Sequence, residues 1–126
     1  MRAGHYAVVD GVTYRCERPQ GPAILLLAPV DEPQPDGFAR DNRGRWRRRV
    51  TVADVSRVFF VRTTAIWKGK RVKVDAVLGD DAAIEYTGTD IDGRPELSQR
   101  EYGVWAGGVT VGSLSDADEE VLEFQL

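Results

Sequence analysis

Histidine and cysteine are almost missing from this chain, which contains one of each in 126 residues. With a single cysteine, Cys16, the chain cannot form an internal disulfide or a multi-cysteine zinc site. The single histidine, His5, leaves no second imidazole for a metal pair. Cys16 follows Tyr14 by two residues in an alternating segment and is interpreted as a buried apolar thiol, so we expect neither a metal nor a cofactor.

Long hydrophobic segments are also lacking. The longest apolar run, Ala23 to Ala28, has 6 residues, whereas a membrane-spanning helix needs about 20. The sequence does not begin with a positively charged leader followed by an apolar stretch. We therefore expect a soluble cytoplasmic protein with no membrane partner.

Sequence motifs of catalysis are missing as well. The chain has no phosphate-binding glycine loop of the usual form and no nucleophile elbow. Paired carboxylates occur at Asp80 and Asp81, but a turn accounts for them. We expect that the protein is not an enzyme.

Lysine is scarce, with three residues against 14 arginines, a bias that is typical of a GC-rich genome. Charge is distributed unevenly, because residues 1–62 have a net charge of +4 and residues 63–126 a net charge of -7. This asymmetry predicts two surfaces that meet different partners, or that meet each other within the fold or in a head-to-tail oligomer.

Three short matches recur in the same order along the chain. The matched pairs, at offsets of 58, 60 and 59 residues, are Tyr6 to Gly11 with Thr64 to Gly69, Ala23-Ile24 with Ala83-Ile84, and Trp46 to Val52 with Trp105 to Val111. They predict two copies of a unit of about 60 residues. The first copy spans residues 1–62 and is basic, and the second spans residues 63–126 and is acidic.

Within each copy, alternating apolar residues and turn signals predict five short strands. The predicted strands are 6–9, 12–16, 24–27, 45–52 and 58–62 in the first copy, and 65–67, 71–77, 83–86, 102–111 and 121–124 in the second. Tight hairpin turns are expected at Asp10-Gly11 and Lys68-Gly69. A helical or 3₁₀ turn is expected before each last strand, at 53–57 and 113–119, and surface loops at 29–45 and 87–101.

This strand order resembles the SH3-like barrel, whose fourth strand leads through a 3₁₀ turn into the fifth. Residues 50–58 (VTVADVSRV) and 109–116 (VTVGSLSD) carry the resemblance, which covers nearly the whole chain. It implies an all-β fold of two tandem SH3-like five-stranded barrels. The segment 58–67 contains no glycine or proline, which favours close packing of the two barrels. The residues with which eukaryotic SH3 domains bind polyproline have no clear counterpart.

Six arginines crowd the segment 40–49 (RDNRGRWRRR) ahead of a Val-Thr-Val run. The candidate partner-binding residues here are Arg43, Arg45, Trp46, Arg47, Arg48 and Arg49. On a strand, Trp46, Arg48 and Val50 share one side and Arg47 and Arg49 the other, with Arg48 at the rim of the core or against Trp46. The second copy has Ala106-Gly107-Gly108 at the matching positions, which indicates solubility or binding rather than folding as the role of the arginines.

A cluster of carboxylates near the end of the chain supplies the second candidate site: Asp116, Asp118, Glu119 and Glu120. Its alternative interpretation is a helix start at Ser115 with favourable charge in the first turn. Tryptophan and arginine are frequent interface hot spots, and the chain also loosely resembles small actinobacterial immunity partners of toxins. The sequence therefore predicts a non-catalytic protein-binding module, with a nucleic-acid-binding barrel that uses the Arg/Trp strand as the alternative.

Overall fold

The computed structural model describes residues 1–29, 33–90 and 96–125, and the chain forms two compact units. The unit called here the N-unit contains His5–Val61 together with the residues from Val121 onward. The C-unit contains Arg62–Glu120 together with Met1–Gly4. Each unit therefore takes a short piece from the opposite end of the sequence.

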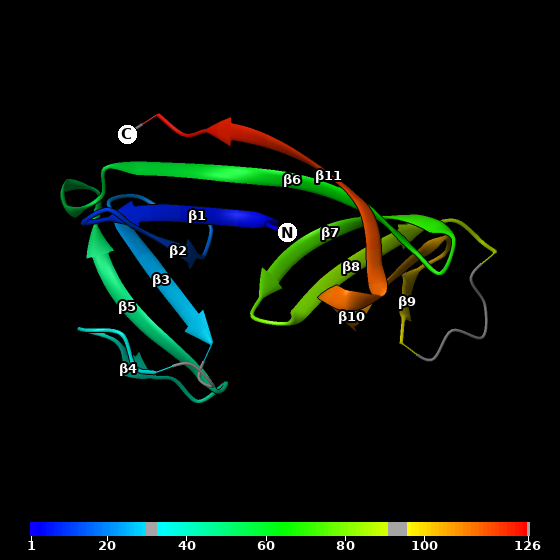
Figure 1. Cartoon of the computed structure of the whole chain (residues 1–126), viewed down its shortest axis with the longest axis horizontal. Coiled ribbons are helices and arrows are strands. Elements are labelled where there is room, and N and C mark those ends of the chain that lie inside the picture. The colour runs from blue at the N-terminus through cyan, green and yellow to red at the C-terminus, as the bar shows by residue number, and fades with distance from the viewer. Residues whose placement is uncertain (30–32, 91–95, 126) are drawn as a thin grey trace. The chain divides into compact units, whose positions relative to one another are not determined.

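The predicted all-β fold is confirmed (Figure 1). The described residues form the strands β1 (Gly4–Val9), β2 (Val12–Cys16), β3 (Ala23–Pro29), β4 (Ala39–Arg40), β5 (Arg45–Thr51), β6 (Arg57–Trp67), β7 (Lys70–Leu78), β8 (Asp81–Thr87), β9 (Ser98–Glu101), β10 (Val104–Thr110) and β11 (Leu114–Glu123). Two 3₁₀ turns, η1 (Val52–Asp54) and η2 (Val111–Ser113), follow β5 and β10.

In the N-unit the strands follow the order β4-β5-β3-β2-β1-β6, and the pairings from β4 through β1 are antiparallel. Although β5 and β6 lie far apart in this order, Val50 of β5 and Val58 of β6 belong to one buried cluster with Ile24 and Leu26 of β3. The sheet therefore curls round a shared core, an arrangement that is compatible with a small β-barrel.

The C-unit follows the order β6-β7-β8-β10-β9, and β11 also pairs with β6. Its core contains Trp67 of β6 and Ile84 of β8, both fully buried, and Val109 of β10 packs against the same cluster. Ala3, from the start of the chain, is buried in this core as well. This sheet too is curled and antiparallel.

The two predicted hairpin turns are confirmed. Asp10 and Gly11 have φ angles of 52° and 77°, and Lys68 and Gly69 have φ angles of 47° and 78°. Positive φ at both central residues is the geometry of the tight turn that matches the twist of a hairpin, and glycine adopts it without steric cost. These turns set the pairing of β1 with β2 and of β6 with β7.

The prediction of a helical turn over 113–119 is wrong, because η2 ends at Ser113 and β11 begins at Leu114. Aspartate and glutamate have low strand propensity, but here the pairing of the backbone with β6 decides the conformation. In the first copy the turn predicted at 53–57 is confirmed as η1, which begins one residue earlier and ends three residues earlier.

The two predicted surface loops contain strands that the sequence analysis missed. The short strands β4 and β9 lie inside segments 29–45 and 87–101, of which residues 30–32 and 91–95 lie outside the described residues. Each strand directly follows a buried apolar residue, Phe38 and Leu97 respectively. One buried side chain anchors each segment, and the strand that follows pairs at the edge of the sheet.

The internal repeat stays a prediction. The units do share local geometry around the 3₁₀ turns, since Val52 donates its backbone N–H to Pro22 O at 3.0 Å and Val111 donates to Asp80 O at 2.8 Å. Pro22 directly precedes β3, which pairs with β5, and Asp80 directly precedes β8, which pairs with β10.

Candidate functional site

The side chains of β5 alternate between the core and the outer face of the N-unit, as predicted. Trp46 is half-buried and packs against the core, Arg48 is half-buried, and Val50 is buried. Arg47 and Arg49 are exposed on the opposite face. The strand thus separates the tryptophan from the two exposed arginines.

Apolar residues of β3 lie beside the exposed arginines. Arg47 is opposite Leu27, and Arg49 is opposite Leu25. On its other side Leu27 is opposite Arg15 of β2, and its side chain is only 2% exposed although it lies on the outer face. Arginine stems cover apolar surface in this kind of arrangement and keep their charged heads in water.

Arg45 has a structural role at the start of β5. Its Nε donates to Asp41 Oδ2 at 3.0 Å, and the backbone N–H groups of Arg43 and Arg45 donate to Asp41 Oδ1 at 2.9 and 3.0 Å. Burial alone would raise the pKa of the Asp41 carboxyl, but these hydrogen bonds and the charge of Arg45 outweigh it and hold the pKa below its ordinary value. Arg45 is therefore occupied within the unit, and a second carboxylate, that of Glu17, lies 3.9 Å from it.

Arg48 lies against the segment that leads into β4. A Cβ atom placed on Gly37 would lie 3.2 Å from Cδ and Nε of Arg48, so the arginine stem passes directly under this glycine. Gly37 has a φ of 81°, and Phe38 after it is buried in the core. The prediction that Arg48 sits at the rim of the core agrees with its half-buried state.

The guanidinium groups of the remaining candidate arginines have no ion-pair partner among the described residues. Within the described parts of the chain, no carboxylate lies within 4.0 Å of the guanidinium of Arg43, Arg47, Arg48 or Arg49. The same holds for Arg18, which follows β2 and which the sequence analysis did not single out. As far as the described residues go, these groups can donate hydrogen bonds to a carboxylate or phosphate of a partner without first breaking an ion pair.

The acidic candidates belong to the C-unit and lie on β11, where they are exposed. Glu119 accepts hydrogen bonds from Arg2, at 2.6 Å from the backbone N–H and 3.3 Å from Nε, and Glu120 Oε2 lies 3.8 Å from Nη1 of Arg62. Asp116 has a φ of 50°, and neither it nor Asp118 has an ion-pair partner among the residues described. Half of this cluster is therefore engaged inside its own unit.

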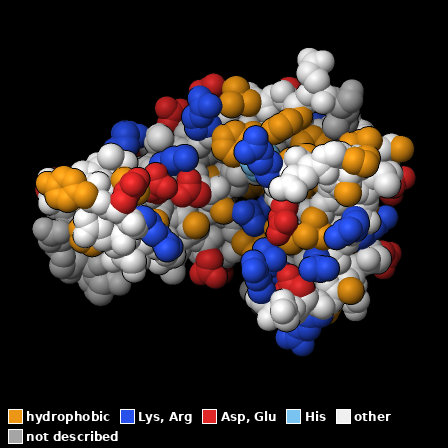
Figure 2. Space-filling model, turned by 180° about the vertical axis from the view of Figure 1, so that it is seen from behind, with side chains coloured by type: hydrophobic (Ala, Val, Ile, Leu, Met, Phe, Trp, Pro, Cys, Tyr) orange, Lys and Arg blue, Asp and Glu red, His pale blue; other side chains and the backbone are white. Residues whose placement is uncertain are grey.

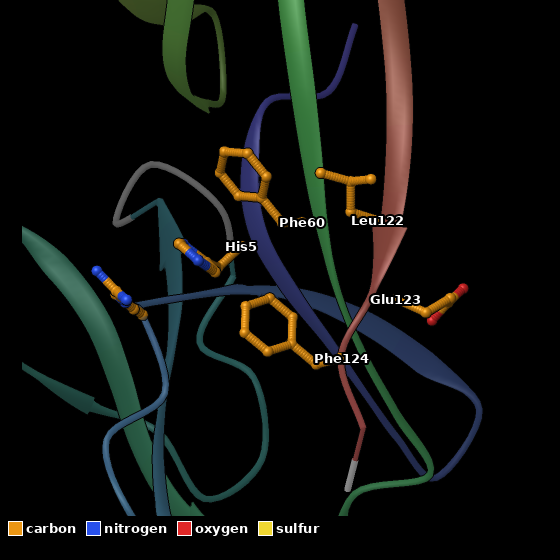
Figure 3. A pocket seen from close by; sticks show the side chains of 6 residues that line it. His5, Phe60, Leu122, Glu123 and Phe124 are labelled. Atoms are coloured by element: carbon orange, nitrogen blue, oxygen red, sulfur yellow. The ribbon is translucent and has the colours of Figure 1, made fainter.

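The N-unit also contains an aromatic pocket that the sequence analysis missed. Its volume is about 340 Å³, and it is lined by His5, Arg18, Phe60, Leu122, Glu123 and Phe124. The ring centroid of His5 lies 4.8 Å from that of Phe60 and 5.6 Å from that of Phe124, with both pairs tilted (Figure 3). These residues come from three distant segments, so no local spacing could have indicated the pocket.

A second, more polar pocket of about 260 Å³ lies next to the first along Arg18. It is lined by Glu17, Arg18, Gln20, Ala23, Leu25 and Arg49. Because Arg18 lines both pockets, the exposed arginine of β5 and the aromatic pocket belong to one continuous part of the N-unit surface.

Two titratable side chains of the N-unit have shifted pKa values. Burial lowers the pKa of His5, and the positive charges of Arg18 and Arg15 lower it further, which keeps the imidazole neutral at pH 7. Burial raises the pKa of the Cys16 thiol to about 11, and its side chain is buried in the core as predicted. The thiol therefore stays protonated and unreactive, whereas His5 faces a positive environment.

Charge is less polarised in the two units than in the two halves of the sequence. The N-unit contains nine arginines and eight acidic residues, a net charge of +1, and the C-unit contains eight basic and 12 acidic residues, a net charge of -4. Figure 2 shows Lys and Arg side chains interspersed with Asp and Glu on the face that it draws. The candidate site is therefore a local group of arginines rather than a large basic field.

Within the described residues, no three His, Cys, Asp or Glu side chains are grouped so that they could hold a metal ion. The same residues contain no helix of the length and apolar character needed to cross a membrane. Comparison of the chain with protein-family models, with curated proteins and with solved structures finds no match.

Proposed function

We propose that this chain is a non-catalytic protein-binding module, built as two SH3-like barrels, that masks a site on a partner as immunity and regulatory proteins do. The observation that carries the proposal is the outer face of β5, where Arg47 and Arg49 are exposed and have no carboxylate partner among the described residues. Arg45, on the same face, holds Asp41 and Glu17 and fixes the start of the strand.

Several features of this face suit a protein partner. Arginine is enriched at interface hot spots, because its planar fork binds carboxylates with paired hydrogen bonds and its stem packs on apolar groups. Pairing of β5 with β3 fixes the backbone of Arg47 and Arg49, and Arg47 also pairs with Ala39 of β4, which reduces the entropy that binding has to remove. Acidic side chains on the partner would form ion pairs with Arg47 and Arg49.

The nucleic-acid alternative required Trp46 and the arginines to act together, with a base stacked on the indole. The alternation of β5 places Trp46 toward the core and Arg47 and Arg49 on the other face. Stacking on Trp46 beside these phosphate contacts is therefore disfavoured, which supports the choice of a protein partner.

The test is affinity purification of the tagged protein from its native lysate after nuclease treatment. The Arg47→Ala/Arg49→Ala variant is compared with Arg71→Ala/Arg100→Ala, which removes the same charge from exposed strand positions of the C-unit. We expect one polypeptide to be retained by the wild type and the control and lost by the β5 variant. With the recombinant partner, the dissociation constant should rise by at least about tenfold in the β5 variant.

Equal retention by both variants would contradict the proposal, and so would recovery of nucleic acid that disappears with nuclease. In the second case binding should also weaken steeply with salt, because phosphate contacts release counterions.

A further inference from the structure

The aromatic pocket of the N-unit is formed where the end of β11 lies beside β6. The backbone N–H of Phe124 donates to Val58 O at 2.9 Å, which fixes the backbone at Phe124 against β6. Phe124 is nevertheless 40% exposed, as is Val121. An apolar pocket of about 340 Å³ with partly exposed rings is large enough to accept a large side chain.

The two carboxylates at the rims of the pockets are matched by arginines of the same unit. Glu123 accepts a hydrogen bond from Nε of Arg57 at 2.7 Å, and in Figure 3 its side chain points away from the rings. Glu17 lies 3.9 Å from Arg45. Among the described residues, neither Arg18 nor Arg49 has a carboxylate within 4.0 Å of its guanidinium group. Arg18 lines both pockets.

We infer that the N-unit binds a protein segment that carries one large apolar side chain, held between Phe60 and Phe124, next to a carboxylate that pairs with Arg18 and Arg49. This inference rests on the proposed function and names the chemistry of the partner. Charge complementarity selects an acidic segment, and the ring-lined pocket selects its apolar anchor.

The shape of the pocket favours a side chain over a nucleobase. The rings of Phe60 and Phe124 are tilted by 47° and 50° against His5, so they form a hollow rather than a flat stacking platform. Leu122 adds an aliphatic wall. A hollow lined by apolar groups with charge at its rim is the usual form of a pocket for an anchor residue.

The neutral state of His5 fits the same partner. Burial and the charges of Arg18 and Arg15 disfavour the imidazolium, and Glu123 is the carboxylate that lines the pocket with it. A bound carboxylate would offset the two arginines, so its binding should raise the pKa of His5. Since His5 is the sole histidine of the chain, its ring signals report this change directly.

The probe is a phage-displayed library of random peptides of about 12 residues, selected against the immobilised full chain. Peptides are then measured against Phe124→Ala and Arg18→Gln, with Tyr102→Ala and Arg100→Gln as controls at exposed positions of the C-unit. We expect the enriched peptides to have an aromatic or large aliphatic residue close to Asp or Glu. Their affinity should fall at least about tenfold in each pocket variant and stay unchanged in the controls.

No enrichment, or enriched peptides whose affinity is indifferent to Phe124→Ala and Arg18→Gln, would overturn the inference. Displacement of the peptides by a short single-stranded oligonucleotide would overturn it in favour of a nucleic-acid ligand. Since Phe124→Ala could disturb the end of β11, the exposed Arg18→Gln variant keeps the test decisive.

The same selection separates this inference from the proposed function. Peptides that depend on Arg47 but not on Phe124 or Arg18 would support the protein-binding proposal and contradict binding in the pocket. Peptides that depend on the pocket but not on Arg47 would move the docking site from the face of β5 to the end of β11.

Discussion

β5 of the N-unit and β10 of the C-unit both lead into a 3₁₀ turn, but their central residues meet the neighbouring segment in opposite ways. At Gly107 of β10, an added Cβ would lie 2.0 Å from the backbone oxygen of Glu96. In β5 the stem of Arg48 lies under Gly37 instead. In the C-unit the glycine, Gly107, is in the strand itself. In the N-unit the glycine, Gly37, is in the segment that lies over the strand.

This difference gives a structural reason for a glycine in β10. From sequence, Ala106-Gly107-Gly108 indicates that a barrel closes without arginines at these positions, which favours a binding role for the arginines of β5. The structure supplies a separate reason for Gly107, because no side chain fits below Glu96. The proposed binding role therefore rests on the exposed Arg47 and Arg49, whereas Arg48 has a packing role.

The largest effect is expected from Gly107→Ala. The new methyl group would overlap the Glu96 carbonyl, and overpacking of this kind typically costs about 1–3 kcal/mol of stability. The measurement is urea unfolding, and Gly112→Ala is the matched control because a Cβ there meets nothing within 4 Å. Equal stability of the two variants would show that the Glu96 segment moves away at little cost.

A smaller loss of stability is expected from Arg48→Gly, which gives β5 the residue that β10 has at its centre. Removing the stem takes away the packing under Gly37 and adds backbone freedom, and substitutions of this kind cost about 0.5–3 kcal/mol. Arg47→Gly at the exposed neighbouring position is the control for the backbone effect. If both variants lose the same stability, Arg48 contributes no packing.

The smallest effect concerns pH and only the N-unit, since the C-unit has no histidine. The pKa of His5 is below its ordinary value of 6.5 in the folded chain, so the unfolded chain binds the proton more readily. Stability of the N-unit should therefore be highest above pH 6.5 and should decrease as the pH falls through 6.5 toward the pKa of the folded state. Amide hydrogen exchange between about pH 5.5 and 7.5 measures this, and His5→Gln should remove the dependence.

Local sequence signals predicted most of the strands because alternation and turn residues act over a few positions. Asp10-Gly11 and Lys68-Gly69 fixed both hairpins in this way. The first part of β11 has no such signal, since its residues from Ser115 to Glu120 are all exposed. Its conformation depends on pairing with β6, which ends 47 residues before β11 begins, so no short window contains both strands.

The candidate site shows the same division between local and distant information. The alternation of β5 placed Arg47 and Arg49 correctly on one face, and the bond of Arg45 to Asp41 spans only four residues. The aromatic pocket needs His5, Phe60 and Phe124, whose separation in sequence gives no pattern before the fold is known.

The exchange of chain ends between the units has a consequence for synthesis on the ribosome. Most of the N-unit, His5–Val61, precedes most of the C-unit in the sequence, so the N-unit lacks Phe124 and the ring-lined pocket until Arg62–Glu120 have been translated. Ala3 precedes the other residues of the C-unit core by more than 60 positions and can be buried only after they have been translated. Domains usually fold one after another during translation, whereas here the N-unit can become complete only after the residues of the C-unit have been translated, so the pocket forms last.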